Sequence, residues 1–175
     1  MSGPTDLIDQ IIALLPRLRR FALLLTRHQD DADDLVQAGV ERALSKLSGW
    51  REGSRLDSWM FKIMQNLWID QMRARRTRGV AAPDFDLDSL AGSDGRADID
   101  ARLTLRATLE ATLKLPEDQR AVVLMVIVEG FSYREAAEVL EVPVGTVMSR
   151  LSRARQALER TVLGDRPAPL LEARS

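Results

Sequence analysis

Apolar residues in this chain recur every three or four positions, which is the period of an α-helix. The first eighty residues contain three such runs, at Leu7–Leu25, Ala32–Leu47 and Leu56–Met72. Pro16 interrupts the first run, so we expect a kink or a new helix start there. A Ser-x-x-Asp pattern at Ser54–Asp57 predicts the start of the third helix, which runs to about Arg76 with Gly79 just beyond it.

The second part of the chain gives four further helical patterns. Leu105, Leu109 and Leu113 mark the first, and Pro116 opens the second, which Gly130 ends. A capping box at Ser132–Glu135 opens a short helix to about Leu140. After a turn, the last helix carries an apolar stripe made of Val147, Leu151, Ala154 and Leu158. A short helix, a tight turn and a longer helix predict a helix-turn-helix.

Between these two groups of helices, residues 79–100 contain Gly, Pro, Ser and alternating Asp, with no helical stripe. We interpret this segment as a flexible linker. The fold class predicted is all-α, with small helical domains at residues 5–78 and 101–163 and a tail at 164–175. The chain is only 5% aromatic and has few alternating β-branched runs, which supports a helical protein.

The composition excludes several kinds of chemistry. The chain has no Cys and one His, His28, so thiolate metal sites, cysteine nucleophiles and Ser-His-Asp triads are excluded. It shows no convincing catalytic carboxylate pair and no Gly-rich phosphate loop. The residues therefore provide no usual catalytic constellation and no usual metal site. No apolar run is long enough to span a membrane and no signal pattern is present, so a cytoplasmic protein is expected.

Charge is distributed unevenly, although the net charge is −1. Residues 1–80 carry +3, residues 81–100 carry −5 and residues 101–175 carry +1. Two mildly basic domains therefore flank an acidic linker, and this local pattern is more informative than the total.

The last helix has a polar side suited to DNA. At 100° per residue, its apolar stripe leaves Thr146, Ser149, Arg150 and Arg153 on the outer side. Hydroxyls and arginines reach base edges and phosphates in the major groove. The alternative is a tight helical hairpin with a solvated basic face, and DNA binding is the favoured interpretation.

Apolar residues cover more than half of the circumference of the third helix, so it is buried on two sides or docks a partner. Its tryptophans are interpreted as core residues. The remaining arc is polar and mostly basic: Lys62, Gln65, Asn66, Arg73 and Arg76, with Asp70 at the edge. Such a strip can bind single-stranded or melted DNA, and a solvated cationic helix end is the alternative.

The second helix presents an outward face made of Asp34, Gln37, Ala38, Glu41 and Ser45. Gly39 lies within this helix, at a cost of roughly 1 kcal/mol relative to Ala. A glycine inside a helix can indicate that a neighbouring element approaches closely.

These segments occur in an order that resembles the sigma-70 family. Asp33-Asp34-Leu35-Val36-Gln37 and the stretch Trp59–Asp70 are similar to region 2. The stretches Leu115–Arg120, Gly130–Ala137 and Val142–Leu151 are similar to region 4. With two domains and no region 3, residues 10–162 resemble the small extracytoplasmic-function (group 4) sigma factors.

The resemblance implies a transcription initiation factor that is not an enzyme and has no cofactor or metal. Such a factor binds RNA polymerase core and directs it to promoter DNA. It assigns contacts with the clamp helices of the largest catalytic subunit to Asp34, Leu35, Gln37 and Glu41. It assigns the −10 element to Lys62, Gln65, Asn66, Asp70, Arg73 and Arg76. It assigns the −35 element to Thr146, Met148, Ser149, Arg150 and Arg153. It further implies contact with the polymerase flap, a monomer when unbound, no membrane insertion, and an anti-sigma factor that covers both domains.

The sequence departs from the family pattern in two places. Gln37-Ala38-Gly39-Val40 stands where relatives usually have Gln-Glu-Thr-Phe, and Met148 stands where Arg or Lys is frequent. The second departure predicts a different −35 preference. Two alternatives remain at this point. One is a sigma-like mimic that binds a regulatory partner without promoter activity. The other is a dimeric helix-turn-helix repressor, which leaves the first domain unexplained.

Overall fold

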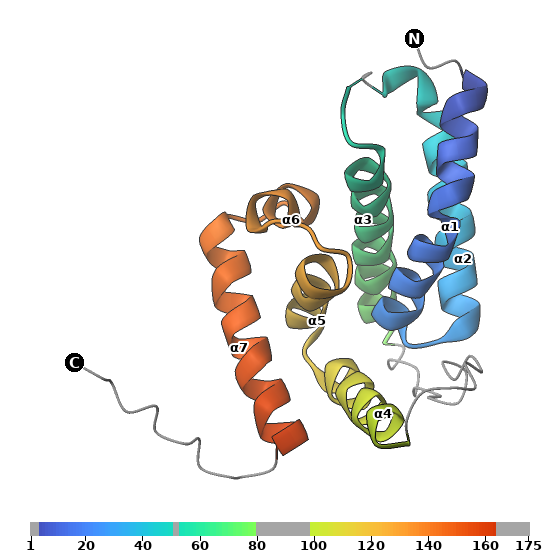
Figure 1. Cartoon of the computed structure of the whole chain (residues 1–175). Coiled ribbons are helices and arrows are strands. Elements are labelled where there is room, and N and C mark those ends of the chain that lie inside the picture. Colours follow the sequence, from blue (N-terminus) through green and yellow to red (C-terminus); the bar gives the residue numbers. More distant parts are fainter. Residues whose placement is uncertain (1–3, 51–52, 80–98, 164–175) are drawn as a thin grey trace.

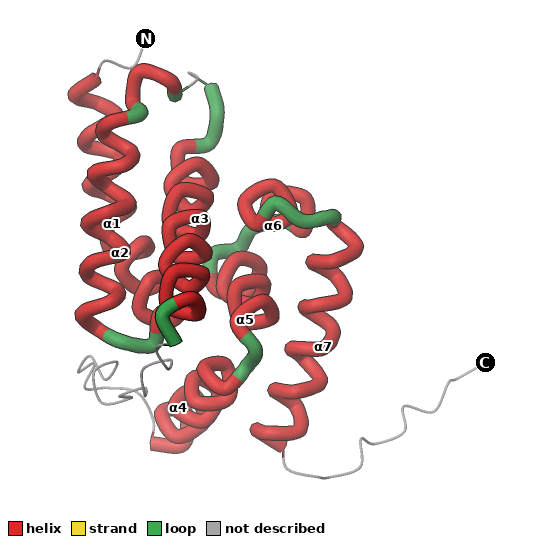
Figure 2. The backbone as a smooth tube through the Cα atoms, turned by 180° about the vertical axis from the view of Figure 1, so that it is seen from behind, coloured by secondary structure: helices red, strands yellow, loops and turns green. Residues whose placement is uncertain are grey.

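The structure of the chain, a computed structural model, describes residues 4–50, 53–79 and 99–163 (Figure 1). Within these ranges the chain forms helices joined by turns and no strand, as predicted (Figure 2). The predicted linker lies almost wholly outside the described residues, and so does the predicted tail. Within the described ranges, each helix is too short or too polar to cross a bilayer.

The helices form two groups that lie side by side. We call the first group the N-terminal bundle: α1 (Pro4–Thr26), α2 (Gln29–Ser45), the 3-10 turn η1 (Leu47–Gly49) and α3 (Leu56–Thr77). We call the second group the C-terminal bundle: α4 (Ile99–Lys114), α5 (Glu117–Val123), the π-helical turn η3 (Leu124–Val128), α6 (Tyr133–Leu140) and α7 (Val144–Leu163). Their buried apolar residues make one continuous core.

Helix α3 lies between the other elements. It packs against α1 and α2 on one side and against α6 on the other (Figures 1 and 2). Its buried residues include Met60, Phe61, Met64 and Trp68. Of the two predicted alternatives, burial on two sides or docking to a partner, the structure shows the first, and the C-terminal bundle covers the second side.

Helix α1 runs through Pro16 without a break, so a new helix start at this position was a wrong expectation. Pro16 is exposed, which leaves its ring in solvent. The apolar residues on both sides of it, among them Ile11 and Leu18, are buried in the same core. Their burial offsets the missing backbone hydrogen bond, which costs about 3 kcal/mol in a helix interior.

The sequence signals for where helices begin and end were correct at some positions and wrong at others. The capping box of α6 is present, with the Ser132 hydroxyl accepting from the Glu135 N–H and Glu135 accepting from the Ser132 N–H. Gly79 and Gly130 adopt positive φ after α3 and after η3, as their positions predicted. The predicted Ser54 cap is wrong, because Arg55 is the N-cap of α3 and caps it with no side-chain bond. Asp57 instead accepts from Arg55 and from the Ser58 N–H.

Gly39 marks the close approach that its place in α2 suggested. A Cβ at Gly39 would lie 2.9 Å from Met64 Cγ, closer than real Cβ atoms come. The departure from the family pattern at Gly39 therefore has a packing explanation. At this position α2 lies so close to Met64 of α3 that a side chain would collide with it.

We expect Gly39→Ala to lower the free energy of unfolding by about 1 kcal/mol. Overpacking against Met64 costs about 1–3 kcal/mol, and the better helix propensity of Ala returns up to about 1 kcal/mol. In a Met64→Ala background the clash is removed, and Gly39→Ala should then stabilise the protein. Urea unfolding of the four proteins measures this change of sign. The same effect in both backgrounds would rule out Met64 as the cause.

The turn η3 departs from the α-helical pattern that follows Pro116. The Glu129 N–H donates to the Leu124 carbonyl five residues earlier, at 2.9 Å. The turn is therefore wider than an α-helical turn. It directs Glu129 and Phe131 towards the N-terminal bundle. There Phe131 meets Phe61 of α3 edge to face, and Glu129 pairs with two arginines of α1.

Candidate nucleic-acid interface

The predicted helix-turn-helix is formed by α6 and α7. Val147, Leu151 and Ala154 fix α7 against the rest of the C-terminal bundle, and all three are almost fully buried. Glu141 closes the turn in the left-handed region, with φ of 54°. The predicted apolar stripe of the last helix is therefore confirmed, and it determines which side of α7 meets solvent.

The predicted DNA residues of α7 are not equivalent in the structure. Met148, Ser149 and Arg153 are exposed, and Thr146 is half-buried. The Arg150 Nε lies 3.0 Å from Asp118 Oδ2 of α5, so this guanidinium is held in an ion pair within the C-terminal bundle. Arg153 is thus the predicted arginine of this helix that projects fully into solvent.

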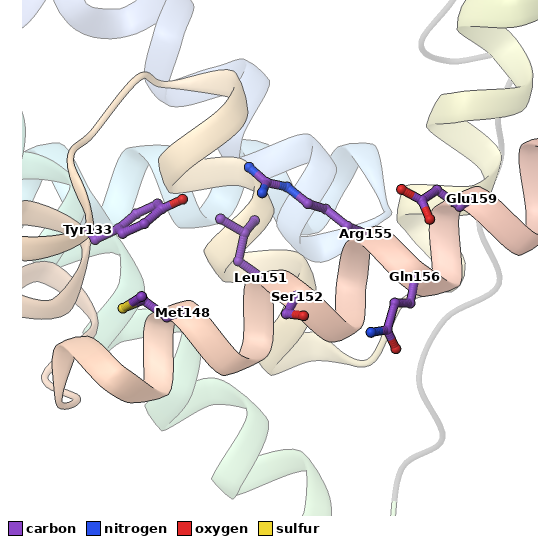
Figure 3. Close-up of a pocket in the computed structure, with 7 residues that line it drawn as sticks. All are labelled: Tyr133, Met148, Leu151, Ser152, Arg155, Gln156 and Glu159. Carbon is purple, nitrogen blue, oxygen red and sulfur yellow. The ribbon is translucent and has the colours of Figure 1, made fainter. Parts of the chain in front are cut away.

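Sequence reasoning missed a groove beside Met148. The groove has a volume of about 360 Å³ and is lined by residues of α6 and α7 (Figure 3). Tyr133 and Met148 lie at one end, and Arg155 and Glu159 lie towards the other (Figure 3). Met148, Arg155 and Glu159 are seven and four residues apart, so the sequence already indicated that they share one side of α7. Nothing in the sequence indicated that Tyr133 of the preceding helix lines the same groove.

The polar arc of α3 is partly covered. Lys62 Nζ lies 2.9 Å from Glu141 Oε1, in the turn of the C-terminal bundle. Gln65 is only 5% exposed, and its Oε1 has no hydrogen-bond partner. Asn66 is half-buried. The strip that appears continuous in the sequence is therefore divided, with its first part against the C-terminal bundle.

The later part of the arc is in solvent. Arg73 and Asp70 are exposed and face each other at 3.8 Å. Arg76 is exposed and lies 3.9 Å from Glu117 of α5, at the limit of an ion pair. These side chains are long and loosely held, so they can turn towards a nucleic-acid backbone.

A second hollow lies where α2, η1 and α3 meet, and sequence reasoning did not find it. Its volume is about 320 Å³, and it is lined by Ser45, Lys46, Ser48, Gly49 and Trp59. Trp59 is half-buried, whereas Trp68 is buried, so the interpretation of the tryptophans as core holds fully only for Trp68.

The outward face of α2 has the predicted polar residues and one unexpected apolar residue. Asp34, Gln37 and Glu41 are exposed, and Gln37 Nε2 donates to Glu41 Oε1 at 3.0 Å. Leu35 is fully buried and belongs to the core. Leu44 is 46% exposed, although the sequence pattern placed it in the apolar stripe. At 100° per residue it lies beside Gln37, at one edge of the outward face.

Ionisable groups gather where the two bundles meet. Burial raises the pKa of Asp57, but hydrogen bonds from Arg55 and the Ser58 N–H outweigh it and hold the pKa below its usual range. Hydrogen bonds from the Ser132 N–H and hydroxyl lower the pKa of Glu135, and Arg55 adds to this. Both carboxylates therefore carry full negative charge at neutral pH.

Arg120 is a buried cation that joins the bundles. Its side chain donates to the carbonyls of Leu113 and Leu115 in its own bundle, at 3.2 and 3.0 Å. It also donates to the carbonyl of Leu25 in α1, at 3.1 Å. Burial lowers the pKa of Arg120 to about 10, and the neighbouring charge of Arg27 contributes. Among the described residues, no group of three or more His, Cys, Asp or Glu gathers as a metal site.

Known proteins match both bundles. A family described as sigma-70, region 4 matches residues 105–158, and one described as the Sigma2 domain of PhyR matches residues 11–65. The ECF RNA polymerase sigma factor EcfG of Rhodopseudomonas palustris is 39% identical over 153 residues, 87% of this chain and 83% of that protein.

Solved structures share the arrangement. The sigma factor RpoE of Bartonella quintana, determined with the anti-sigma factor NepR, has a TM-score of 0.77 and 32% identity. The match covers 92% of this chain and 99% of that one. The PhyRSL–NepR complex from Sphingomonas sp. Fr1 has a TM-score of 0.64 over 95% and 96% of the chains, but its 21% identity shows the fold alone. The chain belongs to the ECF RNA polymerase sigma factors.

Proposed function

We propose that the protein binds RNA polymerase core and directs it to promoters, using α7 at the −35 element and α3 at the −10 element. The observation that carries the proposal is the pair of solvent-facing polar helix surfaces on two bundles whose fold and sequence match sigma factors. Promoter DNA is the nucleic acid, and the protein supplies binding rather than catalysis.

The −35 surface is centred on the outer side of α7. Ser149 and Arg153 project into solvent and can reach base edges and phosphates of a major groove. Arg150 supports α7 through Asp118 and is expected to contribute less to DNA binding. Met148 brings an apolar contact to a place where relatives have a cation, and a thymine methyl group is the base feature it can meet.

We expect Arg153→Ala to weaken binding to duplex promoter DNA about tenfold and to lower the salt slope by about one ion. The exposed guanidinium is lost without loss of packing, so stability should not change. Fluorescence anisotropy at several salt concentrations gives both quantities. Arg160→Ala, an exposed arginine further along α7, is the matched control. Equal affinity and slope for Arg153→Ala and wild type would remove Arg153 from the interface.

The −10 surface on α3 combines Asn66 with the exposed Arg73 and Arg76. An amide can bind base edges of an unpaired strand, and arginines bind its phosphates. The hollow beside Trp59 and Lys46 lies at the start of the same helix and adds an aromatic and a cation to this surface. Lys62 extends the surface towards Glu141 of the C-terminal bundle, whereas Gln65 is buried.

The polymerase surface is the outward face of α2. Asp34, Gln37 and Glu41 give it polar contacts, and Leu44 adds an exposed apolar side chain at its edge. An exposed apolar side chain next to polar groups can contribute to the buried part of a protein interface. We infer that this face meets the clamp helices of the largest subunit, with Leu35 holding α2 in place from within.

We expect Leu44→Asp to weaken binding to core polymerase at least about tenfold, because a carboxylate would be buried at the interface. Gln37→Ala should weaken binding less, since the surrounding contacts remain. Ile12→Asp, which changes another exposed apolar residue on α1, is the control. Competition for core enzyme measures the affinities, and circular dichroism checks folding. Equal loss in Leu44→Asp and Ile12→Asp would argue against the α2 face.

Run-off transcription with core polymerase over genomic DNA tests the proposal as a whole. We expect promoter-dependent transcripts whose start sites share a −10 and a −35 motif. A holoenzyme that assembles but gives no such transcript would favour the sigma-like mimic. An anti-sigma partner is also proposed, since the RpoE relative was solved in complex with NepR.

A further inference from the structure

A small cavity lies where α1, α3 and α5 come together. Its volume is about 140 Å³, well below the roughly 300–1,000 Å³ of pockets that take drug-sized ligands. Thr26 and Arg27 line it from the end of α1 and the bend after it, Trp68 lines it from α3, and Glu117 and Arg120 line it from α5. The cavity therefore has room for a small ion, whereas a nucleotide or a peptide is too large for it.

Two guanidinium groups converge at this cavity. Arg27 Nη1 donates to the Leu113 carbonyl at 3.3 Å, and Arg120 Nη1 donates to the same carbonyl at 3.2 Å. The other hydrogen bonds of Arg120 also go to neutral carbonyls. Glu117 is the carboxylate that lines the cavity, but its Oε2 lies 3.9 Å from Arg76 of α3. Among the described residues, Arg27 and Arg120 thus meet without an ion pair to a carboxylate.

Two buried donors that belong to the lining residues have no acceptor. Trp68 is 2% exposed and Arg120 is 4% exposed. The indole Nε1–H of Trp68 and the guanidinium Nε–H of Arg120 both lack a hydrogen-bond partner. The Thr26 hydroxyl does not serve them, because it donates to the His28 carbonyl and accepts from the His28 N–H. Since indole and guanidinium groups only donate, they require an acceptor from another molecule.

The charge balance selects an anion as this acceptor. Two cations and one carboxylate line the cavity, so a positive charge remains, and the charge of Arg27 contributes to the lowered pKa of Arg120. A water molecule can accept hydrogen bonds, but it leaves this charge uncompensated. A tetrahedral oxyanion supplies negative charge and several acceptor oxygens, which guanidinium groups bind in a forked geometry. Arg27 and Glu117 are half-buried, so the cavity can be reached from solvent at their side.

We propose that Arg27, Trp68 and Arg120 form a binding site for a free tetrahedral oxyanion such as inorganic phosphate. The donors come from α3, from α5 and from the bend after α1, so the bound ion stabilises the folded chain in proportion to its occupancy. A phosphate within a nucleic-acid strand carries a sugar on each side and is too bulky for this cavity. The site is therefore separate from the proposed DNA surfaces, and the proposal does not rest on the proposed function.

Nuclear magnetic resonance tests this site directly, because the Trp68 indole N–H gives a signal of its own. The chain has three tryptophans, and Trp68→Phe identifies this signal by removing it. Inorganic phosphate is titrated into the whole chain, and sodium gluconate, whose anion is too large for the cavity, keeps the ionic strength constant. We expect the Trp68 signal to shift along a saturating curve, while the signal of Trp50, which does not line the cavity, stays in place.

Two substitutions with opposite expected effects make the test specific. Arg27→Gln removes a charge-assisted donor and should weaken phosphate binding at least about tenfold. Glu117→Gln removes the carboxylate that repels the ion and should strengthen binding about two- to fivefold. Arg19→Gln and Glu138→Gln change exposed residues outside the cavity and are the matched charge controls. Urea unfolding gives a second readout, since phosphate should stabilise Arg19→Gln more than Arg27→Gln.

A Trp68 signal that does not respond to phosphate would overturn the proposal, and water would then serve the cavity donors. A response of equal size in Arg27→Gln and Arg19→Gln would also overturn it, because the cause would be a general salt effect. Oligothymidylate is the second probe. If it shifts the Trp68 signal and inorganic phosphate does not, the residues belong to a DNA surface and the free-anion site is wrong.

Discussion

Arg120→Met is expected to lower the free energy of unfolding by about 3–5 kcal/mol, because buried backbone carbonyls lose their hydrogen-bond donor. Methionine fills most of the volume but donates no hydrogen bond. The carbonyls of Leu25 and Leu115 would then be left buried without this donor. Leu113 keeps a contact from Arg27 at 3.3 Å, so the loss there is smaller.

Urea unfolding measures this loss, and two comparisons make it specific. Arg120→Lys should retain part of the stability. The lysine ammonium can donate to some of the three carbonyls, but it lacks the planar, forked guanidinium that reaches all of them. Arg160→Met removes an exposed arginine and should change stability by less than about 0.5 kcal/mol. If Arg120→Met were no worse than Arg160→Met, the three carbonyl contacts would carry no stability.

Phe131→Ala is expected to cost about 3–5 kcal/mol, since the ring is buried between the bundles and a cavity would remain. The loss should be accompanied by less cooperative unfolding, because the aromatic contact joins two bundles that otherwise have their own helices. Denaturant titration followed by tryptophan fluorescence and by circular dichroism separates these effects. All three tryptophans lie in the N-terminal bundle, so non-coincident curves identify the bundle that unfolds first.

A double-mutant cycle of Phe61→Leu and Phe131→Leu isolates the aromatic contact itself. Leucine keeps the residues apolar and avoids the largest cavity. We expect a coupling of about 0.5–1.5 kcal/mol, as measured for edge-to-face pairs. Additive effects of the two substitutions would mean that the rings stabilise their own bundles and not the contact between them.

The features that the sequence predicted correctly depend on near neighbours. The Ser132–Glu135 box, the glycines at 79 and 130, and the apolar stripe of α7 involve residues within one or two helical turns. The two-sided burial of α3 was also predictable, because its wide apolar arc exceeds what one neighbour can cover. Only the identity of the second neighbour, α6, required the structure.

The features that the sequence could not give depend on distant partners. Arg150 faces Asp118 and Lys62 faces Glu141, and these partners lie 32 and 79 positions away along the chain. Leu44 resembled a core residue because it continues the stripe of α2, but none of the described helices covers that edge. Pro16 and Ser54 are the opposite case. Their local preferences were clear, and the burial of the flanking residues and the Arg55–Asp57 contact overrode them.

The wide turn at Leu124–Val128 makes the contact between the bundles sensitive to the deletion of a single residue. A π-helical turn holds one residue more than an α-helical turn, so it sets the rotational phase of everything after it. Deleting one residue from this turn would rotate Glu129 and Phe131 by about 100° around the axis. Both would then leave their partners on α1 and α3 together. Loss of one residue from this turn would therefore remove the Phe131–Phe61 contact and the ion pairs of Glu129 together, while the sequence of α7 stays unchanged.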